Sequence, residues 1–114
     1  MKDATITLKS GHRLCYAEFG DASGVPVFYF HGWPCSRLHA WTMEKAAIEH
    51  GIRLVCPDRP GLGDSEHQHG RQLLDWPPVV EELADHLGWD KFHLIGVSGG
   101  GPYALACSLV MPKR

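Results

Sequence analysis

The sequence lacks the features that would place the chain in a membrane, outside the cell or on a nucleic acid. No apolar run approaches the roughly 18 residues that a membrane-spanning helix needs. The first residues contain no apolar segment of a secretion signal. Eleven basic residues against 13 acidic ones leave a net charge of −2, which offers no basic surface for nucleic acid. We therefore expect a cytoplasmic protein that binds neither a membrane nor nucleic acid.

The four cysteines also lack the spacing of a metal site or a redox motif. No C-x-x-C pair is present, so the pattern predicts buried, reduced thiols at Cys15, Cys35, Cys56 and Cys107. Two of the eight histidines fall in the polar segment 66–69, but no further ligands lie near them in the sequence. We expect no metal site.

What is present is a regular alternation of predicted strands and helices. Short runs rich in β-formers predict strands, at residues 5–8, 14–19, 27–30, 52–56 and 92–97. Helical spacing of apolar residues and flanking Gly or Pro predict helices, at residues 42–50, 77–87 and 99–110. Wholly apolar strands are typical of parallel sheets that are covered on both faces. The order predicts an α/β fold with a mostly parallel sheet and helices on both faces.

The strongest chemical signal is Gly96-Val97-Ser98-Gly99-Gly100, which matches G-x-S-x-G between a predicted strand and a predicted helix. In such an elbow the middle serine points outward from a sharp turn. A Cβ two residues before or after it would collide across the turn, so Gly96 and Gly100 meet a steric demand. The Gly99 N–H is placed to stabilise an oxyanion beside Ser98.

This segment has three other possible interpretations. A glycine-rich turn with an incidental serine stays open when these five residues are judged alone. A dinucleotide fingerprint over 99–104 needs an acidic residue about 20 positions later, and none of the ten residues after Ala104 is acidic. A P-loop needs Lys and Ser or Thr where the chain has Pro102 and Tyr103.

Two further motifs extend the pattern. His31-Gly32-Trp33-Pro34 follows the third predicted strand, and Asp58-Arg59-Pro60-Gly61-Leu62-Gly63-Asp64-Ser65 follows the fourth. Together with the elbow, in this order and spacing, they resemble the α/β-hydrolase fold superfamily, in its serine hydrolase branch. The resemblance implies that Ser98 is the nucleophile and that the N–H groups of Trp33 and Gly99 form the oxyanion hole. It implies no cofactor and a small-molecule acyl substrate.

The resemblance also implies structural roles beside the site, for His31, Gly32, Asp58, Gly96 and Gly100, with Arg59 and Asp64 fixing the loop after the fourth strand. From the residues alone, His31 as a catalytic base stays open as an alternative. Trp33 and Tyr103 either line the pocket or contribute packing. A serine at position 98 argues against the epoxide hydrolase and haloalkane dehalogenase branches, in which the nucleophile is Asp.

The acid and the base are missing from the expected place. In this family the order along the chain is Ser, then Asp or Glu, then His, yet residues 99–114 contain no Asp, Glu or His. We therefore expect residues 1–114 to be the N-terminal portion of a single α/β-hydrolase domain, truncated after the elbow helix and inactive alone. The alternative is a non-catalytic binding or assembly module. An exposed fifth strand would favour self-association or a partner chain.

Overall fold

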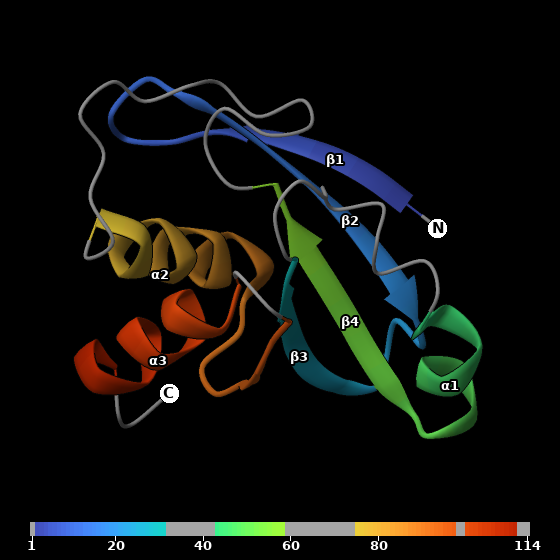
Figure 1. The fold of residues 1–114 in the computed structure, drawn as a ribbon. Helices are drawn as coiled ribbons and strands as arrows, with labels where there is room; N and C mark the ends of the chain where they lie inside the picture. The colour runs from blue at the N-terminus through green and yellow to red at the C-terminus, as the bar shows by residue number, and fades with distance from the viewer. Residues whose placement is uncertain (1, 32–42, 59–74, 98–99, 112–114) are drawn as a thin grey trace.

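The computed structural model describes residues 2–31, 43–58, 75–97 and 100–111 (Figure 1). Within these ranges the strands and helices follow the predicted order β-β-β-α-β-α-β-α. The strands are β1 (Lys2–Thr7), β2 (Arg13–Gly20), β3 (Val25–Phe30), β4 (Ile52–Pro57) and β5 (His93–Gly96). The helices are α1 (Glu44–Glu49), α2 (Trp76–Leu87) and α3 (Gly101–Val110).

The strands form one sheet in the order β1-β2-β4-β3-β5. β2 is antiparallel to both β1 and β4, whereas β3 is parallel to both β4 and β5. Four of the five strands consequently point the same way and only β2 runs against them. The predicted mostly parallel sheet is therefore confirmed, and the carboxyl ends of β3, β4 and β5 meet at one edge.

Alternation along β3 divides the apolar side chains between two cores. Phe28 and Phe30 belong to a cluster that includes Val80 and Leu83 of α2 and Cys107 of α3. Val27 and Tyr29 alternate with these two residues and face the opposite way. They belong to a second cluster, which includes Ala47 of α1. Helices thus cover both faces of the sheet, with α2 and α3 on one side and α1 on the other (Figure 1).

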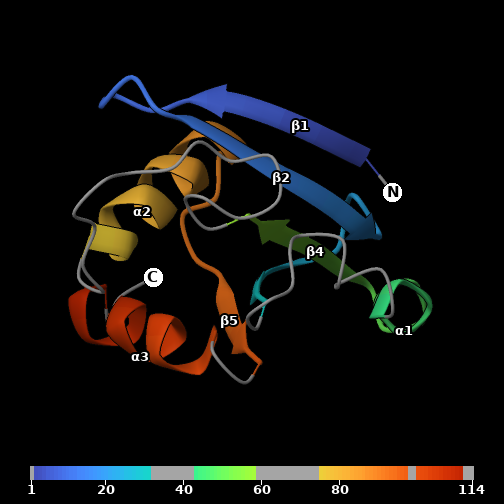
Figure 2. The same ribbon diagram turned by 45° about the horizontal axis from the view of Figure 1, so that its top comes forward.

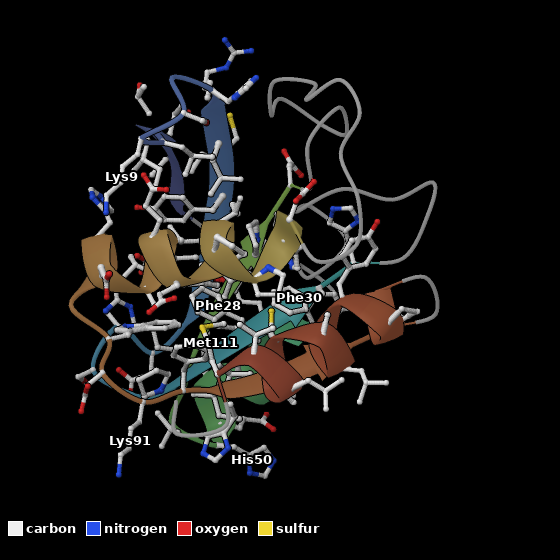
Figure 3. All side chains as sticks on the ribbon, turned by 90° about the vertical axis from the view of Figure 1, so that its left-hand side faces the viewer. Lys9, Phe28, Phe30, His50, Lys91 and Met111 are labelled. Atoms are coloured by element: carbon white, nitrogen blue, oxygen red, sulfur yellow. The ribbon has the colours of Figure 1, made fainter. Side chains whose placement is uncertain are left out.

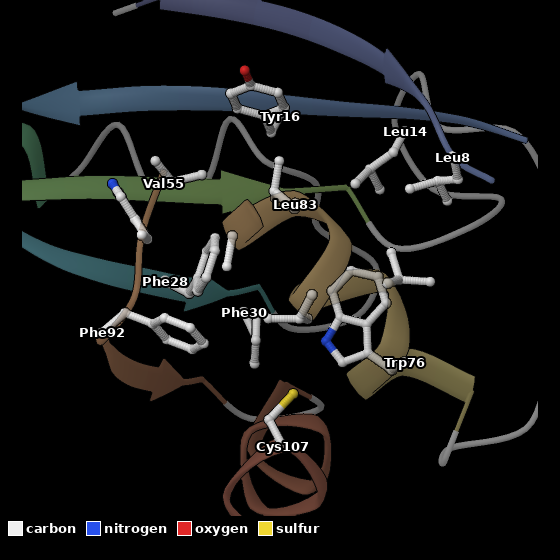
Figure 4. Packing of buried hydrophobic residues seen from close by; sticks show 14 residues of the cluster. Leu8, Leu14, Tyr16, Phe28, Phe30, Val55, Trp76, Leu83, Phe92 and Cys107 are labelled. Atoms are coloured by element: carbon white, nitrogen blue, oxygen red, sulfur yellow. The ribbon is translucent and has the colours of Figure 1, made fainter. Parts of the chain in front are cut away.

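Aromatic rings fill the larger core (Figure 4). The ring of Phe28 is fully buried, and its centroid lies 4.8 Å from that of Trp89 and 4.8 Å from that of Phe92. Phe30 meets the indole of Trp76 edge-on at 5.6 Å. Edge-to-face and tilted pairs at such distances add to the stabilisation that burial alone provides. The whole molecule, turned by 90° from the view of Figure 1, has Phe28 and Phe30 in its interior and Lys9, His50 and Lys91 at its periphery (Figure 3).

Helix α2 begins and ends where proline and glycine predict it. Asp75 precedes the helix and a proline occupies its first turn, where a missing N–H costs little. Gly88 ends the helix in the left-handed region, at φ 74°, and its N–H donates to the carbonyl oxygen of Asp85 at 3.2 Å. Only glycine adopts this conformation without a steric penalty, so the predicted stop at Gly88 is confirmed.

The burial of β5 differs from the prediction. Its apolar sequence predicted a buried strand, but His93, Ile95 and Gly96 are exposed. The reason is its position, because β5 is the last strand in the order and pairs only with β3 among the described residues. Figure 2 shows this strand beside α3, whose outer side carries exposed apolar residues, at Leu105, Leu109 and Val110.

Three of the predicted thiols are described, and all three are buried and form no disulfide there, at Cys15, Cys56 and Cys107. Cys35 lies outside the described residues. Burial raises the pKa of Cys107 from its usual 9.0 to about 12, because the thiolate would lose its hydration inside the core.

This shift predicts a loss of stability in alkali. The folded state holds the Cys107 proton more tightly than the unfolded chain does, so its contribution is complete below pH 9 and declines as the pH rises towards 12. We expect the difference in unfolding free energy between the wild type and Cys107→Ala to shrink above pH 9. Urea titrations of both proteins at a series of pH values measure it. A difference that stays constant to pH 10.5 would contradict the burial of this thiol.

Among the residues that the structure describes, no helix combines the length and the apolar character needed to cross a membrane.

Candidate active site

The carboxyl ends of the three parallel strands carry the residues of the candidate site. The ladder between β3 and β5 continues one step beyond β5, because the Val97 N–H donates to the Phe30 carbonyl oxygen at 3.1 Å. On the other side, the Asp58 N–H donates to the Cys15 carbonyl oxygen at 2.9 Å and so extends the pairing of β4 with β2. His31 and Asp58, which follow β3 and β4 directly, are both fully buried.

A tight turn connects β5 to α3. The Gly100 N–H donates to the Val97 carbonyl oxygen at 2.8 Å, so the last residue of the strand end and the first residue of the helix start are held close together. A Cβ added at Gly100 would lie 2.1 Å from the carbonyl oxygen of Phe30, and one added at Gly96 would lie 2.7 Å from that of Gly100. The backbone cannot accommodate either contact without moving. The close approach that the sequence predicted at both glycines is therefore present.

Helix α3 begins immediately after this turn. Gly100 is its N-cap, a proline lies in its first turn, and its residues include no charged side chain. The first N–H groups of a helix have no partner within it, and together with the helix dipole they favour negative charge nearby. The start of α3 therefore provides a favourable electrostatic environment for an anion formed at the turn.

Packing from α2 supports the same turn. The ring of Tyr103, in the first turn of α3, meets the indole of Trp76 edge-on at 6.1 Å. Trp76 is fully buried and also contacts Phe30 at the end of β3. The contact favours packing for Tyr103, which the sequence left undecided between packing and lining a pocket. Trp76 was not singled out from the sequence, and its only signal is its position directly before two prolines at a helix start.

Several of the predicted residues lie outside the described ranges. They include the nucleophile and both oxyanion donors, and comprise Gly32, Trp33, Arg59, Asp64, Ser98 and Gly99. Their roles therefore stay predictions. Of the residues that flank them, Gly96, Gly100 and the backbone of His31 come together at the end of β3, and Asp58 follows the end of β4.

The described part of the chain contains no group of three or more His, Cys, Asp or Glu side chains that could hold a metal ion. The histidines of segment 66–69 lie outside it. The described part of the site is therefore formed by backbone, from the ends of β3 and β5 and the start of α3.

Comparison with known proteins finds a matching family model and related enzymes. A family model described as alpha/beta hydrolase fold matches residues 25–114. The soluble epoxide hydrolase of Corynebacterium sp. (strain C12) is 38% identical over 96 residues, which cover 83% of this chain and 32% of that protein. A non-heme chloroperoxidase of Streptomyces lividans is 29% identical over 112 residues, which cover 96% of this chain and 41% of that protein. The chain spans well under half the length of either relative.

Solved structures show the same architecture. The epoxide hydrolase CorEH superposes with a TM-score of 0.83 at 32% identity, over 94% of this chain and 37% of that chain. An esterase from Exiguobacterium antarcticum superposes with a TM-score of 0.81 at 26% identity, over 93% of this chain and 39% of that chain. Enzymes with different activities in their names therefore share the fold of this chain.

Proposed function

Because the chain belongs to the α/β-hydrolase fold family, as its three motifs predicted, we propose that residues 1–114 form the N-terminal portion of a serine hydrolase domain. Its substrate is an ester, amide or similar acyl compound, and no cofactor takes part. The observation that carries the proposal is the steric closure of the turn at Gly96 and Gly100, since an elbow needs glycine at both places.

The proposed reaction proceeds through an acyl-enzyme. The Ser98 Oγ attacks the acyl carbon while a base accepts its proton, and the carbonyl oxygen becomes an oxyanion. The N–H groups of Gly99 and Trp33 stabilise that oxyanion, with the start of α3 adding its favourable field. The tetrahedral intermediate then expels the alcohol or amine, which takes up the proton. Water attacks the acyl-enzyme in the same way and releases the acid and free Ser98.

The serine favours acyl chemistry over the reactions of some relatives. The relatives include the Corynebacterium epoxide hydrolase and, from Mycobacterium tuberculosis, a haloalkane dehalogenase. The family resemblance implies that the nucleophile of those two branches is Asp. A carboxylate opens an epoxide or displaces halide by forming an ester, which water then hydrolyses. A serine ether formed in the same way would resist hydrolysis, so the serine at position 98 fits turnover of acyl substrates.

The base and the acid are expected outside residues 1–114, because no Asp, Glu or His follows Ser98 within them. Without a base the serine hydroxyl is a weak nucleophile. We expect the protein expressed from its complete gene to hydrolyse p-nitrophenyl acetate and to leave styrene oxide unchanged. Residues 1–114 alone should show little turnover.

Two variants make this prediction specific. Ser98→Ala should reduce kcat for the ester at least about 1,000-fold, since it removes the nucleophile. Ser108→Ala is the matched control, because Ser108 is exposed on α3 and should change nothing. Equal ester turnover by the wild type and Ser98→Ala, or turnover of the epoxide, would contradict the proposal.

The exposed face formed by β5 and α3 favours a second candidate, a non-catalytic module that assembles with a second copy of itself. Leu105 and Leu109 lie one turn apart on α3 and are 63% and 73% exposed, and within the described ranges β5 is the last strand of the sheet and pairs with β3 alone. Because α3 has no charged residues, two copies can bring these faces together without like-charge repulsion.

This candidate predicts self-association that depends on the leucines. Sedimentation of residues 1–114 should show a dimer that dissociates on dilution, and Leu105→Lys/Leu109→Lys should be monomeric because it places cations on the contact. Lys91→Ala, at an exposed residue just before β5, serves as the control. A wild-type monomer at every concentration would exclude this assembly.

A further inference from the structure

Two tryptophans of the larger core lie at opposite ends of α2 and contact different parts of the sheet. Trp76 is the first residue of the helix, and Trp89 follows its last turn. Both side chains are buried, at 0% and 5% exposure. The ring centroid of Trp89 lies 4.8 Å from that of Phe28 and 6.4 Å from that of Phe92, which comes just before β5. Trp76 instead packs at the carboxyl end of β3, beside the elbow.

The indole of Trp76 contacts both flanks of the elbow. Its centroid lies 5.6 Å from the ring of Phe30 (Figure 4) and 6.1 Å from that of Tyr103, and both contacts are edge-on. The carbonyl oxygen of Phe30 accepts the Val97 N–H at 3.1 Å, and a Cβ on Gly100 would lie 2.1 Å from the same oxygen. Because a close-packed core transmits displacements, a shift of the indole moves both the strand end and the helix start between which the turn lies.

The indole N–H makes tryptophan a costly residue at this position. Among the described residues, the Nε1 of Trp76 is buried and has no hydrogen-bond partner. A buried donor that has left water without gaining an acceptor destabilises the folded state. Phenylalanine or leucine would fill an apolar core without that penalty. Departures from such a local rule are expected at functional sites, and the larger bicyclic ring offers edges to Phe30 and Tyr103 together.

The backbone that carries the indole is restrained. Pro77 and Pro78 follow Trp76 in the first turn of α2, and each pyrrolidine ring fixes its φ near about −65°. Pro77 is itself buried. A side chain on a restrained helix start holds its neighbours more precisely than one on a loop does. The start of α2 can therefore serve as a fixed support for the elbow.

We propose that Trp76 is a positioning residue, which holds the elbow carrying Ser98 in place by packing against Phe30 and Tyr103 at once. It acts through these two residues and not on the reacting atoms. Its catalytic consequence rests on the proposed function, whereas its effect on the geometry of the turn does not.

Amide hydrogen exchange tests the geometric part, on the protein expressed from its complete gene. The reporters are the N–H groups of Val97 and Gly88, each of which donates to a backbone carbonyl oxygen. Trp76→Leu should accelerate exchange at Val97 about tenfold or more and leave Gly88 nearly unchanged, because the lost contacts lie at the elbow. Trp89→Leu is the matched control, since it makes the same replacement at the other end of α2. It should accelerate exchange at Gly88 and not at Val97.

Trp76→Phe is the milder variant and covers the case in which Trp76→Leu does not fold. It keeps one aromatic ring and removes the N–H that lacks a partner. We expect a melting temperature close to that of the wild type, because the lost packing and the removed penalty offset each other. Exchange at Val97 should still be about threefold faster. Unchanged exchange at Val97, loss of protection throughout the sheet, or equal acceleration at Val97 in Trp89→Leu would overturn the proposal.

The rate at which a fluorophosphonate labels Ser98 tests the catalytic consequence. Trp76→Phe should slow labelling about tenfold, because a small displacement of the nucleophile lowers the rate steeply, and Trp89→Phe should be labelled at the wild-type rate. If the wild type is not labelled, the proposed function fails and the exchange result still decides the geometric part. Normal labelling of Trp76→Phe despite faster exchange at Val97 would show that the catalytic part of the proposal is wrong.

Discussion

Gly100→Ala is expected to prevent the chain from forming its native sheet edge. The added Cβ would lie 2.1 Å from the Phe30 carbonyl oxygen and 2.7 Å from the Phe30 carbonyl carbon, both of which are backbone atoms. Relief requires α3 to move away from β3, which disrupts the packing of the larger core. Overpacking a tight site typically lowers the free energy of unfolding by about 1–3 kcal/mol. We expect a loss at or above the upper end of this range, because the backbone atoms of Phe30 cannot move aside as a flexible side chain can.

Gly101→Ala provides a matched control at the next residue. A Cβ there meets no atom within 4 Å, and Ala is the better helix former in the first turn of α3. Thermal unfolding of the two variants should therefore diverge, with Gly101→Ala at or above the wild type and Gly100→Ala far below it or insoluble. Similar melting temperatures for both variants would show that the turn is wider than described.

Phe28→Ala is expected to produce the second large loss. The ring is fully buried, lies 4.8 Å from two other aromatic rings, and belongs to β3, which lies between β4 and β5 in the sheet. Removing a buried phenylalanine typically costs about 3–5 kcal/mol, because the cavity that remains collapses only partly. Urea unfolding, followed by tryptophan fluorescence, should show this decrease.

Val25→Ala is the control on the same strand. Its side chain is 49% exposed, so its removal should cost less than about 1 kcal/mol. Comparable losses for the two variants would contradict the assignment of Phe28 to the core and would place the aromatic cluster elsewhere.

The sequence predicted the elements well because their signals are local. Apolar runs bounded by glycine predicted β3 and β4, and Pro77 with Gly88 predicted both ends of α2. The exposure of β5 could not be predicted in the same way, because the apolar sequence of a strand does not indicate which other strands and helices pack against it. The exposure of Ile95 follows from the strand order, which is a property of the whole sheet.

The site was predictable to a similar degree. Clashes at Gly96 and Gly100 follow from the geometry of a sharp turn, so the five-residue motif was sufficient to predict them. The seating of that turn against Phe30 was not, since it joins residues that are 70 positions apart in the sequence. The role of Trp76 was not predicted for the same reason, because its contacts with Phe30 and Tyr103 depend on how α2 packs.

The covalent adduct formed by a fluorophosphonate tests the central claim most directly. Peptide mass spectrometry of the protein expressed from its complete gene should locate the adduct on Ser98, with none in Ser98→Ala and wild-type labelling in Ser108→Ala. Residues 1–114 alone should be labelled far more slowly, because they supply no acid or base after the serine. An adduct on another residue, or no adduct at all, would contradict the account of Ser98 as the nucleophile.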